Sequence, residues 1–172
     1  MPFIRYTKKY KKELSMTFNS GNIYLDNFIK DSKSLDSNIG TTYIYLNSVK
    51  SEIIAYFNIG TGSLIDKSSV DSMKMGGSVH LNCFALDEKY QGLKVASEGI
   101  LCKLSDYLLF KCIDVIKKIK KHVGFSFITL YSTKQGYNLY KRIGFEELET
   151  DMELPFDSSE VKCKPMYLPL MQ

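Results

Sequence analysis

Hydrophobic residues recur along this chain with the two periods that distinguish strands from helices. Residues 41–47 (TTYIYLN) alternate and are rich in β-formers, and a short polar turn leads into residues 53–60 (IIAYFNIG). These two segments therefore predict a β-hairpin. Upstream, residues 3–6 predict a short strand, and residues 24–29 (YLDNFI) carry apolar side chains at helical spacing.

The second half of the chain shows both periods again. Residues 78–86 (SVHLNCFAL) alternate and predict a strand, with His80 and Asn82 on one face. Apolar positions from Leu101 to Ile119 then step by three or four, which predicts one long amphipathic helix that ends at basic residues and Gly124. Residues 125–132 (FSFITLYS) are apolar enough for a strand buried on both faces.

The remaining segments complete a single expected domain, residues 1–172. Residues 134–143 predict a short helix closed by Gly144, and strands are expected at residues 145–149 and 165–170. Residues 61–77 are polar and lack a period, so they predict a long loop. This order of elements indicates an α/β (α+β) fold around a mixed sheet.

Composition narrows the class of protein only slightly. The 172 residues are 44% hydrophobic and carry a net charge of +4, which suits a phosphorylated ligand and tolerates RNA without requiring it. The charged N-terminal segment does not resemble a signal peptide, and no apolar run reaches the roughly 20 residues of a spanning helix. We therefore expect a cytoplasmic protein that does not contact a membrane.

The residues that could carry metal or nucleophilic chemistry form no recognisable pattern. Four cysteines include no CxxC pair, so we expect free thiols, and the two histidines have no ligand spacing. No G-x-S-x-G turn indicates a serine hydrolase. The sequence thus predicts no metal site.

The most unusual stretch is KYQGLKVASEGIL, residues 89–101, at the expected start of the long helix. Glycine and small residues at a helix start let a ligand approach the backbone, and the unpaired N–H groups there favour an anion such as phosphate. The dinucleotide pattern GxGxxG and the P-loop pattern GxxxxGK[ST] are both absent, so those two folds are excluded.

This stretch resembles the central motif of the GNAT superfamily of acyl-CoA-dependent N-acetyltransferases. In that family an apolar strand and an acidic turn precede [Q/R]-x-x-G-x-[G/A], which opens a long helix; Gln91, Lys94 and Ala96 stand at the three patterned positions. YNLYKRIGFEEL resembles the second signature of the family. SGNIYLDNFIK and PMYLPL are similar to the subgroup of toxin acetyltransferases that act on aminoacyl-tRNA.

The resemblance implies a GNAT-like fold and an acetyl-CoA site. The fold would be a mixed, mostly antiparallel central sheet flanked by helices, with splayed strands at the acetyl-CoA site. The strand end would hold the pantetheine arm, and the following turn would wrap the pyrophosphate. The expected cofactor-binding positions are Phe84, Ala85, Leu86, Gln91, Gly92, Leu93, Lys94, Val95, Ala96 and Ser97, together with Tyr137 from the second signature.

Lys94 departs from the family pattern, which has glycine at this position. A lysine can pair with the phosphates directly. The alternative is that Lys94 points outward and the loop has drifted, which would weaken or abolish the binding of acetyl-CoA. The sequence leaves both alternatives open.

The resemblance also assigns catalytic roles. Tyr140 falls where the family places the acid that protonates the departing CoA thiolate, and a phenol with its pKa near 10 holds that proton at neutral pH. Tyr137 lies one turn earlier and could exchange roles with it, or both tyrosines could simply pack. His80 could act as a base through water, but a structural histidine is as compatible with the sequence, so the base stays open.

The predicted activity is transfer of acetyl from acetyl-CoA to a primary amine, by direct attack in a ternary complex. The acceptor is a small molecule, a peptide or aminoacyl-tRNA; two lysine-rich runs, KKYKK and KKIKK, are available for RNA phosphates or are solvated faces. The alternatives are a toxin-type enzyme that acetylates aminoacyl-tRNA and a catalytically degenerate CoA-binding module. A homodimer is expected by analogy alone.

Overall fold

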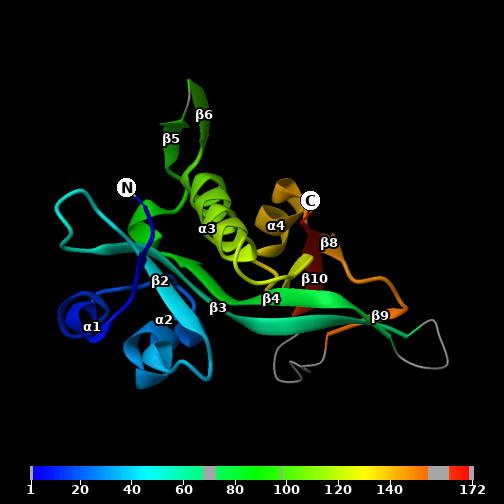
Figure 1. Ribbon diagram of the computed structural model, residues 1–172. Helices are drawn as coiled ribbons and strands as arrows, with labels where there is room; N and C mark the ends of the chain where they lie inside the picture. The colour runs from blue at the N-terminus through cyan, green and yellow to red at the C-terminus, as the bar shows by residue number, and fades with distance from the viewer. Residues whose placement is uncertain (1, 68–72, 98, 155–162, 171–172) are drawn as a thin grey trace. The chain divides into compact units, whose positions relative to one another are not determined.

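The chain forms a mixed sheet with helices, seen here in a computed structural model that describes residues 2–67, 73–97, 99–154 and 163–170 (Figure 1). The strands are Ile4–Arg5 (β1), Thr41–Leu46 (β2), Ile53–Asp66 (β3), Met73–Leu86 (β4), Lys94–Ser97 (β5), Ile100–Lys103 (β6), Phe127–Ser132 (β7), Glu146–Glu147 (β8), Met152–Glu153 (β9) and Lys164–Pro169 (β10). The α-helices are Lys8–Leu14 (α1), Ile23–Lys30 (α2), Leu104–Lys120 (α3) and Tyr137–Ile143 (α4). Two 3-10 helices cover Ser32–Leu35 (η1) and Glu88–Tyr90 (η2).

The main sheet has the strand order β1-β2-β3-β4-β7-β10-β8, and β9 pairs with β3 beside this path. The ladders β1–β2, β2–β3, β3–β9, β7–β10 and β10–β8 are antiparallel, whereas β4 and β7 are parallel. The predicted mixed, mostly antiparallel sheet is therefore confirmed. A separate two-stranded sheet contains β5 and β6.

The chain divides into two compact units. The first contains Met1–Ile59 and Cys83–Val115, and the second contains Gly60–Asn82 and Ile116–Gln172. The strands β3 and β4 and the helix α3 each contribute residues to both units. We describe each unit by itself.

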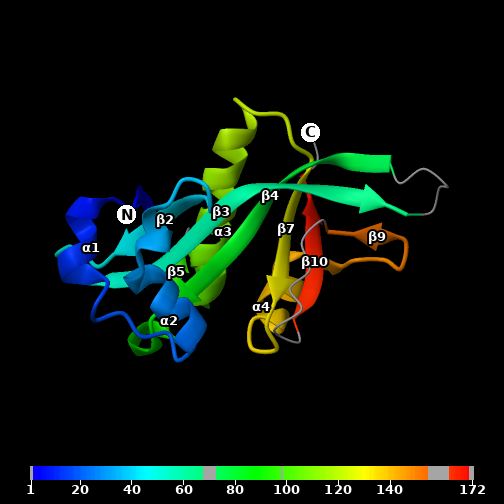
Figure 2. The same ribbon diagram turned by 90° about the horizontal axis from the view of Figure 1, so that it is seen from below.

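The first unit is built around Tyr56 on β3. Its ring is fully buried, Phe28 of α2 stacks on it, and its hydroxyl donates a hydrogen bond of 2.7 Å to the carbonyl oxygen of Leu25. Figure 2 shows α2 lying against β3. The helix starts where expected because the Asn22 side chain accepts hydrogen bonds from the N–H groups of Tyr24 and Leu25.

The second unit positions α4 after β7. The helix ends at Gly144, whose φ of +103° is the left-handed conformation that a closing glycine adopts. The buried ring of Phe145 then packs edge-on against Tyr140, with 5.5 Å between the ring centroids. The short helix and its glycine stop were predicted correctly.

The predicted loop at residues 61–77 is wrong for most of its length. β3 continues to Asp66 and β4 begins at Met73, while residues 68–72 of the predicted loop lie outside the described residues. The extension of β3 pairs with β9, from much later in the chain, and Leu64 is its fully buried side chain. A strand with so few buried positions has no readable period, so only its distant partner reveals it.

Candidate active site

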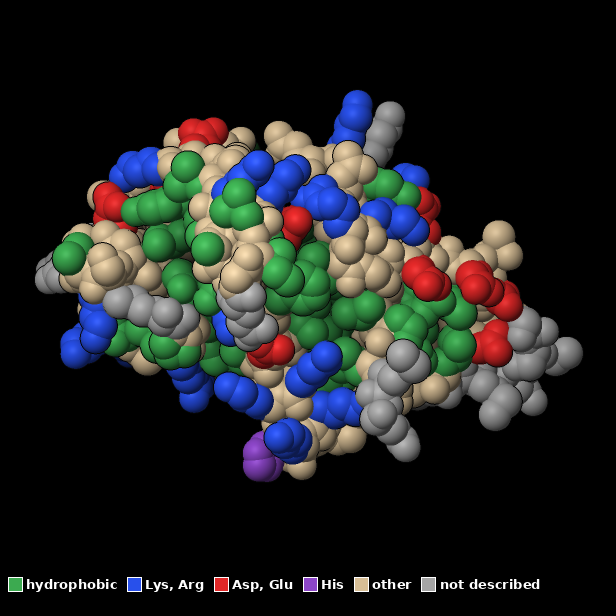
Figure 3. All heavy atoms as spheres, turned by 90° about the horizontal axis from the view of Figure 1, so that it is seen from above, with side chains coloured by type: hydrophobic (Ala, Val, Ile, Leu, Met, Phe, Trp, Pro, Cys, Tyr) green, Lys and Arg blue, Asp and Glu red, His purple; other side chains and the backbone are tan. Residues whose placement is uncertain are grey.

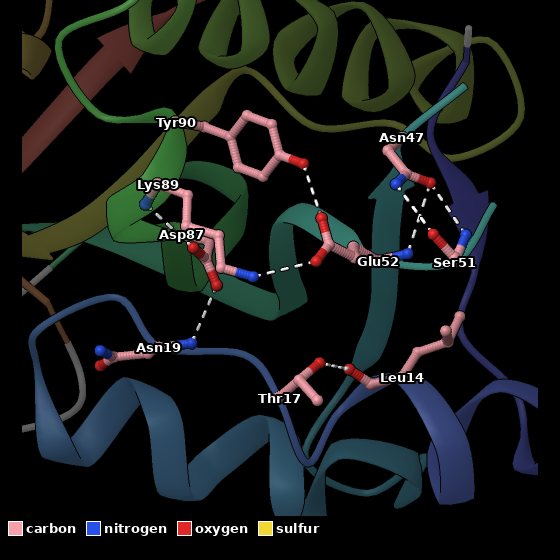
Figure 4. Close-up of polar contacts among 9 residues, drawn as sticks. All are labelled: Leu14, Thr17, Asn19, Asn47, Ser51, Glu52, Asp87, Lys89 and Tyr90. Carbon is pink, nitrogen blue, oxygen red and sulfur yellow. Dashed lines mark hydrogen bonds and ion pairs between the residues drawn. The ribbon is translucent and has the colours of Figure 1, made fainter. Parts of the chain in front are cut away.

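The end of β4 is fixed by a hydrogen-bonded turn in the first unit (Figure 4). Asp87 is buried; one carboxylate oxygen accepts the backbone N–H of Asn19 at 3.0 Å, and the other accepts that of Lys89 at 3.0 Å. Lys89 and Tyr90 each donate to the Glu52 carboxylate at 2.9 Å. These hydrogen bonds lower the pKa of Glu52. The family resemblance implied an acidic turn at this place, but sequence reasoning did not identify Asp87 as its cap or Glu52 as its partner, although an aspartate before a 3-10 turn is a typical cap.

Gln91 closes the turn onto the strand. Its side-chain amide nitrogen donates to the carbonyl oxygen of Leu86 and to that of Ser20, both at 2.9 Å. The segment near Ser20 is held a second time, since Glu88 donates its N–H to the carbonyl oxygen of Asn19 at 2.8 Å. Gln91 was predicted as a cofactor-binding residue; in the structure it ties the end of β4 to the segment before α2.

The next residues correct the prediction of a helix that opens at the motif. Lys94, Val95, Ala96 and Ser97 form β5, a hairpin returns through β6, and α3 begins only at Leu104 (Figure 1). Gly92 at φ +74° and Gly99 at φ +79° lie before and within this hairpin. Leu101 and Leu104, whose spacing was predicted to be helical, therefore lie in different elements: Leu101 in β6 and Leu104 at the start of α3. Cys102 also lies in β6 rather than in α3.

The physical reason for this error is a coincidence of periods. The two strands in residues 94–103 are too short to show a clear alternation of apolar and polar residues. Their exposed and half-exposed apolar side chains happen to continue the spacing of the helix that follows. Gly99, between Ser97 and Ile100, was the sequence signal for a hairpin, because tight hairpin turns require positive φ. The hairpin carries four of the predicted cofactor residues, and Gly92 and the half-exposed Leu93 lead into it.

The predicted pantetheine positions lie at the end of β4. Ala85 and Leu86 are buried and Phe84 is half-buried. The ladder between β4 and β7 covers four pairs, from Ser78 with Phe127 to Leu81 with Leu130, and β4 runs on to Leu86. Ala85 belongs to the buried core of the first unit, together with Tyr56.

Tyr140 and Tyr137 differ in their surroundings, although both belong to α4. Tyr140 is buried, and a side chain at Gly136 would meet its ring at 3.0 Å. Tyr137 is half-buried, and its hydroxyl donates a short hydrogen bond to the Glu147 carboxylate, which raises the pKa of Tyr137. Lys164 donates to the same carboxylate at 3.1 Å and lies 4.8 Å from the Tyr137 ring centroid.

His80 belongs to a buried polar chain in the second unit. Its Nδ1 lies 3.0 Å from the Thr129 hydroxyl oxygen, which in turn lies 3.2 Å from the Ser78 hydroxyl oxygen. Burial lowers the pKa of His80 to about 4, so its imidazole is neutral at neutral pH. A side chain at Gly62 would meet the Ser78 hydroxyl at 2.8 Å, which explains the glycine there.

The described residues contain neither a metal-binding group nor a membrane-spanning helix. In the described ranges, no three histidine, cysteine, aspartate or glutamate residues are grouped as a metal site would require. Within the same ranges, no helix combines the length and the apolar character needed to cross a bilayer. All four cysteines are free thiols, as predicted.

The fold matches solved bacterial toxins over nearly the whole chain. A structure described as a bacterial toxin matches with a TM-score of 0.74 and 20% identity, covering 98% of this chain and 92% of that one. AtaTR bound with acetyl-CoA matches at 0.71 and 18%, covering 97% and 92%. AtaT complexed with acetyl-methionyl-tRNAfMet matches at 0.68 and 17%, covering 97% and 93%.

These matches establish the fold, which the sequence resemblance had predicted. No protein-family model matches the sequence, and no curated protein shows significant similarity to it. The likeness is therefore structural, at sequence identities of 20% or below for the three structures compared. The chain has the fold of the AtaT toxins.

Proposed function

We propose that this chain, as a single catalytic domain, is an N-acetyltransferase that uses acetyl-CoA. The observation that carries the proposal is the match over nearly the whole chain to AtaT, a protein whose structures contain acetyl-CoA and an acetylated aminoacyl-tRNA. The two sequence signatures of the acyl-CoA-dependent family fall at the end of β4 and on α4 of this fold. The proposal thus has independent support from sequence and fold.

The proposed reaction is a direct transfer of the acetyl group from the thioester to the amine of the acceptor. A neutral amine of the acceptor attacks the thioester carbonyl carbon, and backbone N–H groups near Leu86 stabilise the oxyanion of the tetrahedral intermediate. The C–S bond then breaks, the CoA thiolate takes a proton from the Tyr140 hydroxyl, and the Tyr140 phenolate regains a proton from solvent. The amine loses its extra proton to water or to a general base to which no residue is assigned. His80 has a low pKa of about 4 and is therefore a weak base.

Tyr140 is proposed as the acid rather than Tyr137 because it stands directly before KRIGF, the position of the acid in the second signature. The Tyr137 hydroxyl already donates to Glu147, which raises its pKa and ties it to the corner between α4 and β8. AtaT and KacT were both studied as variants in which one tyrosine is replaced by phenylalanine, which supports a role for a single tyrosine in this fold. We therefore assign Tyr137 to positioning α4.

The proposed acceptor is the amino group of aminoacyl-tRNA. AtaT forms a complex with acetyl-methionyl-tRNAfMet, and the exposed lysines Lys117, Lys118 and Lys121 gather where α3 ends. Figure 3 shows Lys and Arg side chains, in blue, at several places on the face that it draws. Such a cluster suits the phosphate backbone of RNA. AtaT also binds the C-terminus of its antitoxin AtaR, so an antitoxin is a further proposed partner.

A second candidate function is a CoA-binding module without catalysis. The observation that favours it is the hairpin β5–β6, which replaces the helix start that the family signature predicts. One experiment separates the two functions. Calorimetric titration with acetyl-CoA measures binding, and release of free thiol in the presence of charged tRNA or simple amines measures turnover.

For the active enzyme, wild type binds acetyl-CoA and turns over, and Tyr140→Phe loses about 100-fold or more in kcat with nearly unchanged affinity for acetyl-CoA. Tyr24→Phe is the matched control, because Tyr24 is 72% exposed. Full turnover of Tyr140→Phe would remove Tyr140 from the mechanism. Binding without turnover on any amine would establish the non-catalytic module, and absence of binding would refute both functions.

A further inference from the structure

The helix α4, which carries the proposed acid Tyr140, is short and has no side-chain cap at its start. It has seven residues, and its N-cap is Gly136, which has no side chain to accept an N–H group of the first turn. A helix of this length is marginal on its own and depends on tertiary contacts. The ring of Tyr140 lies against this first turn, since a Cβ at Gly136 would come within 3.0 Å of it. The position of Tyr140 therefore depends on what fixes the start of α4.

The two ends of α4 are held in different ways. At the C-terminal end, the buried ring of Phe145 packs edge-on against Tyr140. At the N-terminal end, the hydroxyl of Tyr137 donates a hydrogen bond to the Glu147 carboxylate on β8 (Figure 1). Lys164 on β10 donates to both oxygens of that carboxylate at 3.1 Å, and its ammonium lies 4.8 Å from the centroid of the Tyr137 ring. All of these residues belong to the second unit.

The strands that carry Glu147 and Lys164 are themselves fixed. β10 lies between β7 and β8, Glu147 stands opposite the fully buried Met166, and Lys164 stands opposite Ser132, the last residue of β7. The hydrogen bonds from Tyr137 and Lys164 lower the pKa of Glu147, so its carboxylate is charged at neutral pH. Hydrogen bonds to a charged group are stronger than those between neutral groups. The Tyr137 hydroxyl therefore ties the first turn of α4 to a fixed point of the sheet.

We propose that Glu147 and Lys164 are positioning residues of the acetyl transfer, which act through Tyr137 on the start of α4 and so on the phenol of Tyr140. The proposal rests on the proposed function, in which Tyr140 protonates the departing thiolate. It adds to that function two residues that act on the acid only through the helix. A contact of this kind affects turnover more than stability, because a displacement of a reacting group by about 1 Å can cost about 100-fold in rate.

The neighbouring residue of β8 supplies a matched control. Glu146 also accepts a hydrogen bond from a tyrosine, since the hydroxyl of Tyr167 on β10 donates to it at 3.2 Å. That contact joins β8 to β10 and does not involve α4. Glu146 and Glu147 are both exposed. A comparison of the two glutamates therefore isolates the contact with α4.

The test measures steady-state release of CoA thiol, with acetyl-CoA and aminoacylated tRNA as substrates. Glu147→Ala and Lys164→Met should each lower kcat by about 10-fold, and calorimetry should find their affinity for acetyl-CoA unchanged. Glu147→Gln should keep more of kcat than Glu147→Ala, because its amide oxygen still accepts the Tyr137 hydroxyl. Lys164→Arg keeps the charge and should stay close to wild type. Glu146→Ala should have the wild-type kcat.

A second measurement separates positioning of the acid from a general structural role. Glu147→Ala is combined with Tyr140→Phe, and kcat of the double variant is compared with that of Tyr140→Phe alone. If Glu147 acts through the acid, its substitution has no further effect once the Tyr140 hydroxyl is gone. A general loss of structure would lower kcat by the same factor in both backgrounds.

The outcomes are distinct. Loss of kcat in Glu147→Ala and Lys164→Met that disappears in the Tyr140→Phe background supports the proposal. Wild-type kcat in both variants, or an equal loss in both backgrounds, overturns it and leaves the proposed function intact. Full turnover of Tyr140→Phe removes the acid and the positioning role together, but not the transferase. No turnover by wild type overturns the proposed function as well.

The variants are expected to fold. Glu147 and Lys164 are exposed, and an exposed ion pair contributes little to stability, so the melting temperature of each variant should lie within about 4 °C of wild type. If Glu147→Ala nevertheless fails to fold, Lys164→Met in the wild-type and Tyr140→Phe backgrounds carries the same test.

Discussion

The side-chain amide of Gln91 donates a hydrogen bond to the carbonyl oxygen of Leu86 at 2.9 Å, five residues back at the end of β4. The same nitrogen donates to the carbonyl oxygen of Ser20, also at 2.9 Å. One amide group thus joins the strand that would present the thioester site to the segment that precedes α2. The glutamine of the signature motif therefore shapes the site through the backbone of the chain itself.

This arrangement predicts a stability cost for Gln91→Leu. The substitution removes the two hydrogen bonds of the Gln91 amide, and the carbonyl oxygens of Ser20 and Leu86 must then bond to water. The free energy of unfolding should therefore fall by about 1 kcal/mol. Urea denaturation measures it. The affinity for acetyl-CoA should fall with it, because Leu86 and the following turn become less fixed. Gln135→Leu is the control, since Gln135 is exposed; equal stability of the two variants would show that the Gln91 hydrogen bonds contribute nothing.

His80 predicts a dependence of stability on pH. Its pKa is about 4 in the folded chain and about 6.5 in an unfolded one. Below pH 6.5 the unfolded chain therefore binds a proton that the folded chain does not, and stability falls as the pH is lowered toward 4. The total loss from this group is about 3 kcal/mol.

The measurement for His80 is urea denaturation at several pH values between 7.5 and 4.5. His80→Gln should remove much of the loss of stability between pH 6.5 and 5, above the range in which most carboxylates titrate. His122→Gln replaces the exposed histidine and should keep the wild-type pH dependence. A wild-type pH dependence in His80→Gln would contradict the burial of a neutral imidazole.

Gly144 predicts a backbone effect next to the proposed acid. Its φ of +103° is unfavourable for an L-residue, whereas an added Cβ would have an ordinary contact of 3.7 Å with Leu168. Gly144→Ala should therefore cost about 1 kcal/mol through backbone strain alone, and it should reduce turnover by shifting α4 and Tyr140. Gly124→Ala has open space around it and should be neutral or slightly stabilising. Thermal unfolding of the two variants tests the difference.

Local patterns in the sequence determined most of the elements that position the site. The alternation in β2 and in the second half of β4, the Asn22 cap of α2 and the glycine stop of α4 act over a few residues, so they can be read without a structure. The expected acid at Tyr140 likewise lies on the short helix that its neighbours predict. The fold class followed from the order of these elements.

Only the tertiary structure decided what depends on distant partners. Residues 61–66 extend β3, which lies beside β4 in the sheet and pairs with β9 at Ile65 and Asp66. The turn after β4 is fixed because Asn19 and Glu52 reach it from earlier segments. The motif at Lys94 reads as a helix start from its small residues, yet its backbone pairs with residues 100–103. Hydrogen-bond partners far apart in sequence leave no periodic signal, and for that reason the contact that ties α4 to β8 and β10 became visible only once the fold was known.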